Sequence, residues 1–297
     1  MQFQKAERRK AKLRLGITGP SGSGKTWGAL LIAKGIGGKI AVIDTERGSA
    51  SLYTNLVDFD VLELAPPYTP ERFIEALKSA ESAGYETVII DSITHEWSGV
   101  GGCLELVDKV AASKFKGNSW SAWNEVTPRH RALLDSILRS PLHVIVTMRS
   151  KTETAQTEEN GRKKVVKLGM KAEQRDGFEY EMTTVLDLTH DGHFALASKD
   201  RTGLFSGDPK TLSEKTGVML REWLENGSEP LPSAADVAVN LLETSRDGGE
   251  LSAIWAKNAR GWSELMSEAD FARVTEAKDT MKAKFVPAVD PFSQEVA

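Results

Sequence analysis

Short, continuous apolar runs alternate along the first half of the chain with segments that carry apolar residues at helical spacing. The runs are predicted strands at residues 13–18, 39–44, 86–91 and 142–148. Helices are predicted over 25–35, over 70–83 and from Thr127-Pro128, an N-cap and first helical residue. Because these strands are continuous apolar runs and not alternating ones, both faces of their sheet must be covered. The pattern predicts an α/β fold with a mainly parallel central sheet.

The pattern changes after residue 150. Residues 152–171 are polar and basic around Asn160-Gly161, a pair typical of a hairpin turn. A second antiparallel hairpin is expected from 183–189 and 193–198, and a helix near 209–225 follows it. The sheet is therefore predicted to carry an antiparallel hairpin extension.

The C-terminal quarter is predicted to be organised separately. The stretch after Gly227 contains two prolines and is typical of a linker. Beyond it the chain reads as helical, with the core candidates Ile254, Trp255, Leu265 and Phe271. The predicted divisions are a domain over 1–227, a linker over 228–235, a small helical domain over 236–285 and a flexible tail over 286–297.

The amino-acid composition excludes several classes of protein. Of 297 residues, 40% are hydrophobic and 27% charged, which argues against wholesale disorder. The net charge of −4 means that nucleic acid must be bound by local patches, such as the basic segments 1–14 and 149–171. A single cysteine, Cys103, excludes an intramolecular disulfide and a cysteine-based zinc site. Without a membrane-length apolar run or a secretory signal, a cytoplasmic protein is expected.

The turn after the first predicted strand carries the strongest chemical signal. It fits the phosphate-binding pattern G-x-x-x-x-G-K-[ST] with Gly19, Pro20, Ser21, Gly22, Ser23, Gly24, Lys25 and Thr26. Small residues let backbone N–H groups surround phosphate oxygens, and the start of the helix adds its positive dipole end. Lys25 is expected to reach the β- and γ-phosphates and Thr26 to hold Mg²⁺. The sequence thus predicts a nucleoside triphosphate site.

Carboxylates at the ends of two other strands are candidates to complete this site. Asp91 can hold the water shell of Mg²⁺. Asp44 and Glu46 lie at the end of the second strand, where a carboxylate can orient or deprotonate the attacking water. The histidines show no metal-ligand spacing, and His190 and His193, beside a turn, are expected to be solvated. Mg²⁺ is the only metal predicted.

With these residues in place, the chain resembles the RecA-type ATPase core. The resemblance implies that Glu46 is the catalytic base and that Tyr53, seven residues later, stacks on adenine. Lys199 and Arg201 match two cations that RecA-type proteins extend into the ATP site of a neighbouring subunit. Arg149 lies near the place of the family's γ-phosphate-sensing glutamine, which this chain lacks, and becomes the candidate for that contact.

Five segments are more closely similar to phage-encoded AAA-family ATPases. They are LRLGITGPSGSGKT, KIAVIDTERGSASLY, VIIDSITHEW, VIVTMRSKTE and QRDGFEYEM. This group includes the Sak-four-type single-strand annealing proteins, which are minimal RecA-like cores, and the similarity covers about residues 1–227. It implies a RecA-like P-loop NTPase core that uses ATP and Mg²⁺ in DNA annealing or recombination, in the cytoplasm of the phage's host.

RecA-type proteins bind single strands through two loops, which match about 95–120 and 150–176 here. The second loop carries the candidate DNA-binding cations Arg162, Lys163, Lys164, Lys167, Lys171 and Arg175. Such cations neutralise backbone phosphates and give salt-dependent binding without sequence preference. The first loop and the residues after it hold Lys109, Lys114, Lys116, Trp120 and Trp123. The tryptophans could stack on bases, but packing in the core is the more frequent place for such residues.

Assembly is expected from the same resemblance. Phe3-Gln4-Lys5-Ala6 has the F-x-x-A form by which archaeal and eukaryotic recombinases dock one subunit on the next. A head-to-tail contact of this kind generates a ring or an open helical filament. The expected partners are therefore single-stranded DNA, further copies of the chain, and single-strand-binding or other replication proteins at the acidic tail, with no membrane.

The resulting hypothesis is a Mg²⁺-dependent ATPase with a RecA-like core that binds single-stranded DNA and supports annealing or recombination. Two alternatives remain open. One is a helicase-like motor or loader, and the other is a nucleotide-gated assembly protein without a DNA role. A small-molecule kinase would need an acceptor site, and none is recognisable in the sequence.

Overall fold

The computed structural model describes residues 5–159, 162–228 and 232–285, with the backbone alone at 152–159, 162–169 and 269. The chain divides into two compact units, Met1–Ser228 and Glu229–Ala297. Each unit has a hydrophobic core of its own. Among the residues described, none of the helices combines the length and the apolar character that crossing a bilayer demands.

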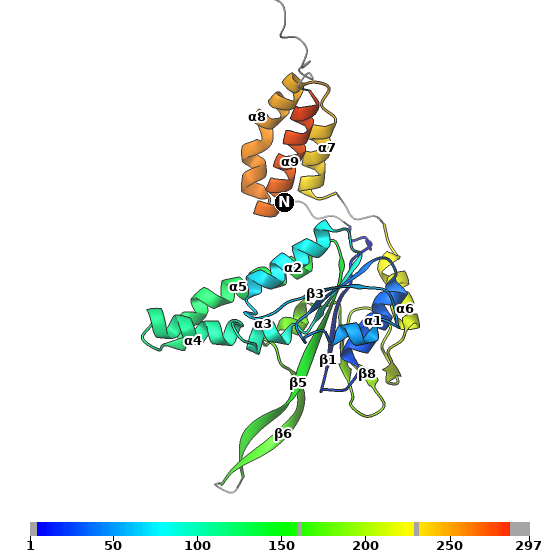
Figure 1. The fold of residues 1–297 in the computed structure, drawn as a ribbon, viewed down its shortest axis with the longest axis vertical. Helices are drawn as coiled ribbons and strands as arrows, with labels where there is room; N and C mark the ends of the chain where they lie inside the picture. Colours follow the sequence, from blue (N-terminus) through cyan, green and yellow to red (C-terminus); the bar gives the residue numbers. More distant parts are fainter. Residues whose placement is uncertain (1–4, 160–161, 229–231, 286–297) are drawn as a thin grey trace, which may run out of the picture. The chain divides into compact units, whose positions relative to one another are not determined.

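One sheet forms the centre of the first unit (Figure 1). Its described strands are β1 (Arg14–Gly19), β2 (Ile40–Asp44), β3 (Asp60–Glu63), β4 (Thr87–Asp91), β5 (His143–Glu159), β6 (Arg162–Ala172), β7 (Thr184–Leu188), β8 (Phe194–Asp200) and β9 (Lys210–Thr211). Their order is β3-β2-β4-β5-β1-β7-β8-β9, and β6 pairs with β5. Pairing is parallel from β3 to β7 and antiparallel for β7–β8, β8–β9 and β5–β6. The predicted α/β class and the four apolar strands are confirmed.

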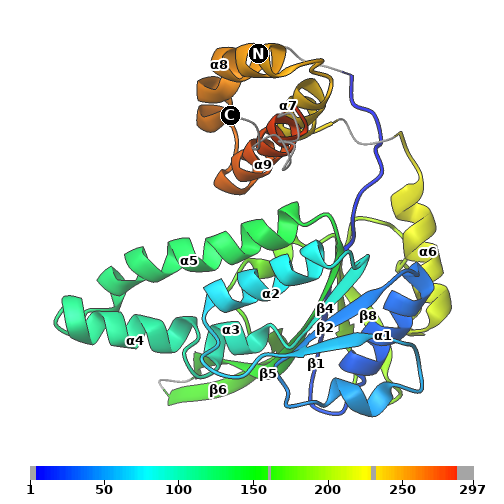
Figure 2. The ribbon, with the colours of Figure 1, turned by 45° about the horizontal axis from the view of Figure 1, so that its top comes forward.

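Helices cover both faces of the sheet, as strands apolar on both sides require. The helices of this unit are α1 (Lys25–Ile36), α2 (Pro70–Ser82), α3 (Thr94–Ser98), α4 (Cys103–Lys114), α5 (Ser119–Arg139) and α6 (Glu214–Glu225). Helices α2 and α5 pack on one face, and α1 and α6 on the other (Figures 1 and 2). The carboxyl ends of β1, β2 and β4 thus meet beside the start of α1, where nucleotide sites of open parallel sheets are formed.

The sequence prediction of a helix start at Thr127-Pro128 is wrong. Helix α5 begins at Ser119, and the N-cap Asn118 accepts a hydrogen bond from the backbone N–H of Ser121. Pro128 lies inside the helix on its exposed side. Buried positions continue at helical spacing on both sides of it, at Ala122, Val126, His130, Leu133 and Ile137. Packing of this continuous face outweighs the hydrogen bond that an internal proline removes, a loss of about 3 kcal/mol.

Strand β5 takes part in two sets of strand pairs. Up to Arg149 it pairs with β1 inside the central sheet, and from Ser150 it pairs with β6 in a two-stranded antiparallel ribbon (Figure 1). The ribbon's register has an irregularity between Glu153 and Thr154. The turn predicted at Asn160-Gly161 lies outside the described residues, but the strands beside it pair as a hairpin there requires.

The second unit consists, in its described part, of α7 (Ala234–Glu243), α8 (Gly248–Leu265) and α9 (Glu268–Lys284). The N-cap side chains of Ser233, Asp247 and Ser267 each accept a backbone hydrogen bond from the first turn of their helix. The capping box of Ser233 starts α7 inside the segment predicted as a linker. Of the predicted core residues, Leu265 is 84% exposed, which corrects that prediction.

Arg14 closes the C-terminal end of α5 from the start of β1. It is buried, and its guanidinium donates to four carbonyl oxygens, those of Leu13, Leu138, Ser140 and Leu142, at 2.5–3.1 Å. Burial lowers the pKa of Arg14 to about 10. We expect Arg14→Leu to lower the free energy of unfolding by about 3 kcal/mol, because buried carbonyls lose charged donors. Urea denaturation measures this, with the exposed Arg139→Leu as the control; equal midpoints for the two variants would contradict it.

Candidate nucleotide-binding site

The turn between β1 and α1 is shaped to receive an anion. Gly22 and Gly24 adopt φ values of 77° and 88°, a region in which a side chain would be strained. No described side chain caps the first N–H groups of α1, so these donors are available to a ligand. Within the described chain, the fully buried hydroxyl of Ser23 finds no hydrogen-bond partner. The loop thus offers several unsatisfied donors at one point.

Lys25 and Thr26 follow this loop at the start of α1. The Lys25 ammonium donates to the carbonyl oxygens of Gly19 (3.0 Å) and Pro20 (2.8 Å), so it lies folded against the loop. The Thr26 hydroxyl donates to a carboxylate oxygen of Asp91 at 2.6 Å. The sequence-predicted pair of metal-binding residues is therefore in contact.

Asp91 is buried at the end of β4, and burial raises the pKa of its carboxyl group. Hydrogen bonds from the hydroxyls of Thr147 (2.5 Å) and Thr26 act in the opposite direction. A carboxylate oxygen and a hydroxyl oxygen 2.6 Å apart are hard ligands of the kind that Mg²⁺ prefers. The donor set at this point fits the ion that the sequence predicts.

The carboxylates of Asp44 and Glu46, at the end of β2 and in the turn after it, have different surroundings. The buried Asp44 carboxylate accepts hydrogen bonds from the backbone N–H groups of Glu46 (2.5 Å) and Ala50 (3.1 Å). Its oxygens hold the turn in shape. The Glu46 side chain instead lines a cavity of about 500 Å³ that it shares with Lys25 and Asp91. Of the two candidates, Glu46 is the carboxylate that faces this cavity.

Arg149 lines the same cavity from the end of the sheet part of β5. Its Nε and Nη2 atoms donate to one oxygen of Glu46, at 3.0 and 2.9 Å. Both side chains are partly exposed, 46% for Arg149 and 28% for Glu46, so a ligand that enters the cavity can reach the pair. The structure brings together the predicted base and the predicted phosphate-sensing residue.

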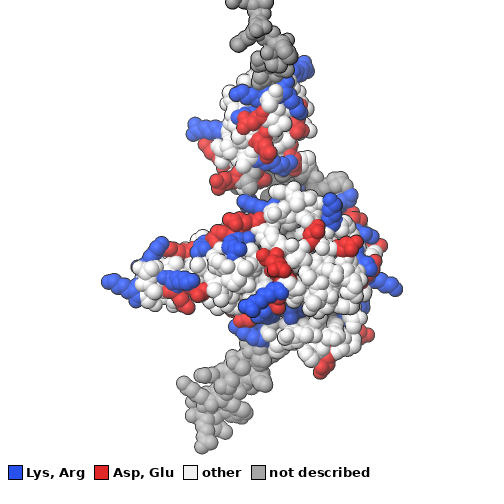
Figure 3. All heavy atoms as spheres, in the orientation of Figure 1, with Lys and Arg blue, Asp and Glu red and all other residues white. Residues whose placement is uncertain are grey.

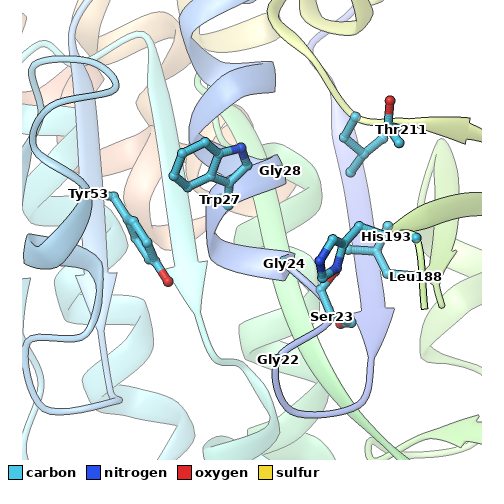
Figure 4. Close-up of a pocket in the computed structure, with 11 residues that line it drawn as sticks. Gly22, Ser23, Gly24, Trp27, Gly28, Tyr53, Leu188, His193 and Thr211 are labelled. Atoms are coloured by element: carbon cyan, nitrogen blue, oxygen red, sulfur yellow. The ribbon is translucent and has the colours of Figure 1, made fainter. Parts of the chain in front are cut away.

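The aromatic side of the site contains one predicted residue and several that sequence reasoning missed. Tyr53 ends the 3₁₀ turn Ala50–Tyr53, and its ring meets that of Trp27 edge to face at 5.6 Å. Both rings also line a second cavity of about 480 Å³, next to the first (Figure 4). His193, expected to be solvated, is exposed but bonds the Ser23 carbonyl oxygen through Nδ1 at 3.1 Å. The position of Trp27 directly after Thr26 was the available signal.

Lys199 and Arg201 do not line the cavity of their own chain. The Lys199 ammonium donates to the backbone carbonyl oxygens of Glu179 (2.9 Å) and Tyr180, and Arg201 donates to the Tyr180 carbonyl oxygen at 3.1 Å. Both residues thus lie at the carboxyl end of β8, beside the 3₁₀ turn Phe178–Glu181 that precedes β7. A role in the chain's own site is not supported by this position.

The predicted first DNA loop is largely helical, because it comprises α3 and α4 and the start of α5. Trp123 stacks on Trp97 at 5.5 Å and belongs to the packed interior of this helical arm. Trp120 is 86% exposed near the free end of the arm. Figure 3 shows lysine and arginine side chains at that end, with acidic side chains among them. The two tryptophans therefore have different environments, and Trp120 alone of this pair is free to stack on a base.

The second predicted DNA loop is the β5–β6 ribbon and the residues after it. The Arg175 guanidinium lies over the Trp123 ring at 5.4 Å and packs inside the arm, and Lys171 forms an ion pair with Asp176 at 2.8 Å. The remaining candidates have side chains outside the described residues: Arg162, Lys163, Lys164 and Lys167. The register sets Lys164 opposite Thr157, and Lys163 opposite Glu158.

A buried polar cluster joins α3, α4 and α5. Glu96 is fully buried, and its carboxylate accepts hydrogen bonds from the Cys103 thiol (3.0 Å) and the Gln174 amide (3.4 Å) and contacts His130 Nδ1 at 3.0 Å. The ligand atoms of Glu96, Cys103 and His130 lie within 4.8 Å of one another. Burial raises the pKa of Cys103, so the thiol remains a proton donor and the cluster is satisfied internally.

Comparison with known proteins adds one finding to this geometry. A family described as "AAA domain" matches residues 11–214, a segment that contains the phosphate loop, Glu46, Asp91, Arg149 and the β7–β8 hairpin. No curated protein matches the chain.

Proposed function

We propose that this chain, which belongs to the AAA domain family of P-loop ATPases, hydrolyses ATP with Mg²⁺. We propose further that it binds single-stranded DNA and supports annealing or recombination of phage DNA, the roles that the sequence resemblance implies. The observation that carries the proposal is the cavity in which Lys25, Thr26, Asp91, Glu46 and Arg149 converge on the phosphate loop. An ATPase needs these groups at one place, because phosphoryl transfer is catalysed by positioning and charge stabilisation.

Each residue of the site has a role in this proposal. The loop N–H groups and Lys25 bind the phosphates, and Thr26 and Asp91 hold Mg²⁺. The bound ion supplies positive charge that offsets the charge developing on the phosphate oxygens. Glu46 takes the proton of the attacking water, since it is the carboxylate that faces the cavity.

Arg149 makes hydrolysis depend on the triphosphate. In the structure its guanidinium is occupied by Glu46. The γ-phosphate of ATP carries more charge than a single carboxylate and competes for the same donors. Binding of ATP would then free Glu46 to act on water, whereas ADP, without this phosphate, would leave the pair closed.

Assembly would complete the site. Lys199 and Arg201 lie away from the cavity of their own chain, as cations that serve a neighbouring subunit would. We propose that head-to-tail copies, in a ring or a filament, place these two side chains beside the neighbour's phosphates. Phe3 and Gln4 of the expected docking motif lie outside the described residues.

The ribbon would link the nucleotide to DNA. The ribbon part of β5 starts at the cavity and β6 ends at it, because Ser150 on β5 and Glu173 just after β6 line the cavity beside Arg149. The backbone N–H of Glu173 donates to the Arg149 carbonyl oxygen at 2.7 Å. The ribbon that carries the candidate DNA-binding cations would thus begin one residue after Arg149, the residue that contacts Glu46.

Neutralising three ribbon lysines tests the DNA interface. We expect Lys163→Gln, Lys164→Gln and Lys167→Gln together to lower single-strand affinity about tenfold or more and to reduce the salt slope of binding by about 2, because three phosphate contacts are lost. ATP affinity should be unchanged, because the described side chains that line the cavity are all kept in this variant. Fluorescence anisotropy at several salt concentrations measures both quantities.

The matched control removes the same charge elsewhere. Lys257, Lys282 and Lys284 are exposed lysines of the second unit, and their triple glutamine variant should bind DNA as the wild type does. The ribbon's role is contradicted if both triple variants keep wild-type affinity and salt slope, or if both lose the same amount.

The ATPase rate with and without single-stranded DNA tests the proposed function as a whole. A DNA-binding ATPase of this kind should hydrolyse ATP faster when DNA is present. Duplex unwinding would favour a helicase-like motor instead. Hydrolysis that is indifferent to DNA, together with no DNA binding, would favour a nucleotide-gated assembly protein.

A further inference from the structure

Figure 4 shows the second cavity, which lies next to the phosphate cavity. The two cavities share Gly22, Gly24, Trp27 and Tyr53, so one ligand can extend from one into the other. Trp27 and Tyr53 come from α1 and the turn after β2 (Figure 4). Leu188, His193 and Thr211 come from the β7–β8–β9 end of the sheet. The cavity is therefore formed by distant parts of the chain.

Trp27 is the residue best placed to present a flat surface in this cavity. It follows Thr26 directly, and it remains 43% exposed although its ring packs against that of Tyr53. The edge-to-face contact at 5.6 Å restricts how the indole can turn. Tyr53 thereby supports Trp27, and the exposed part of the indole is available to a planar ligand.

The opposite wall is held against the phosphate loop. The Nδ1 atom of His193 bonds the Ser23 carbonyl oxygen at 3.1 Å, which ties the β7–β8 turn to the loop. Beside it, Leu212 packs so closely on α1 that a Cβ atom on Gly28 would lie 2.6 Å from its side chain. Aromatic and aliphatic groups thus line a cavity with few charges, which suits a heterocyclic ring and not a further phosphate.

We propose that this cavity holds the nucleobase of the bound nucleotide and that Trp27 is the residue on which the base stacks. The proposal rests on the proposed nucleotide-binding function and extends it. It assigns to Trp27 the contact that family resemblance implies for Tyr53, and it gives Tyr53 the part of a supporting ring. His193 and Leu212 close the opposite side.

Comparing ATP with inorganic tripolyphosphate tests this assignment, because the two ligands share the phosphates and differ in the nucleoside. Calorimetry on the full chain in magnesium buffer measures both affinities for the wild type, Trp27→Ala and Trp27→Phe. Stacking on an aromatic side chain predicts that Trp27→Ala lowers ATP affinity roughly tenfold or more and leaves tripolyphosphate affinity unchanged. Trp27→Phe should retain most of the ATP affinity.

The matched control is Leu52→Ala, an exposed apolar residue beside Tyr53 that does not line the cavity. It should change neither affinity. Equal losses for both ligands in Trp27→Ala, or no loss for ATP, would overturn the stacking assignment while leaving nucleotide binding intact. A wild-type protein that binds neither ligand would overturn the nucleotide site itself, and the base cavity with it.

Discussion

Lys25→Ala should reduce ATP turnover by at least about 10²- to 10³-fold, the loss typical of removing one preorganised charge from a transition state. The Lys25 ammonium lies in the cavity against the Gly19 and Pro20 carbonyl oxygens, where it can turn to the phosphates. Burial lowers its pKa, while Asp91 and Glu46 act to raise it. Steady-state phosphate release under saturating ATP and Mg²⁺ measures the change.

Lys34→Ala is the matched control for this variant. Lys34 lies on the same helix but is exposed and pairs with Glu214 at 3.0 Å, away from the cavity. A surface pair of this kind contributes about 0–1 kcal/mol, so turnover and fold should be preserved. Turnover by Lys25→Ala within threefold of the control would refute the assignment of the phosphate site.

Glu46→Gln should separate nucleotide binding from hydrolysis. The amide has nearly the shape of the carboxylate but cannot take the proton of water, so the rate should fall by about 10² to 10⁴, the usual contribution of a general base. ATP should bind at least as tightly as before, because Arg149 is no longer held by an ion pair with residue 46. Single-turnover hydrolysis and equilibrium ATP binding measure the two effects.

Asp44 and Glu63 provide contrasting references for that experiment. Asp44→Asn would disturb the turn itself, because its carboxylate accepts two backbone hydrogen bonds, and both binding and hydrolysis should suffer. Glu63→Gln, at the exposed end of β3, should change neither. If Glu46→Gln hydrolyses ATP at the wild-type rate, the base must be another group.

The phosphate loop and the central strands could be predicted because their signals are local. The loop needs eight adjacent residues, and strands buried on both faces have continuous apolar centres, as 88–90 and 144–146 do. Strand β3 escaped prediction because only one of its residues is even half-buried, which leaves no apolar run. Asp44 and Glu46 could be named as candidates, but only the hydrogen bonds to Asp44 separate their positions.

Contacts between residues that are far apart in the sequence could not be predicted from local sequence patterns. The second cavity joins Trp27 to His193 and Leu212, and no spacing rule connects positions so far apart. The path of α5 shows a different limit. The local preference of proline predicts a helix start at Pro128, whereas the residues at helical spacing on both sides of it form one continuous buried face. Burial outweighs local propensity when a continuous face is packed.

The passage of β5 from sheet to ribbon without a break has a mechanical consequence. The strand between Arg149 and Glu159 extends about 33 Å at roughly 3.3 Å per residue, so a tilt of about 5° at its base would displace its far end by about 3 Å. Arg149 lies at the point where the strand leaves the sheet and enters the ribbon. A small movement at Arg149 that leaves the sheet unchanged would therefore move the far end of the ribbon by a larger distance. Conversely, a force on the far end of the ribbon would act on Arg149 and on its ion pair with Glu46.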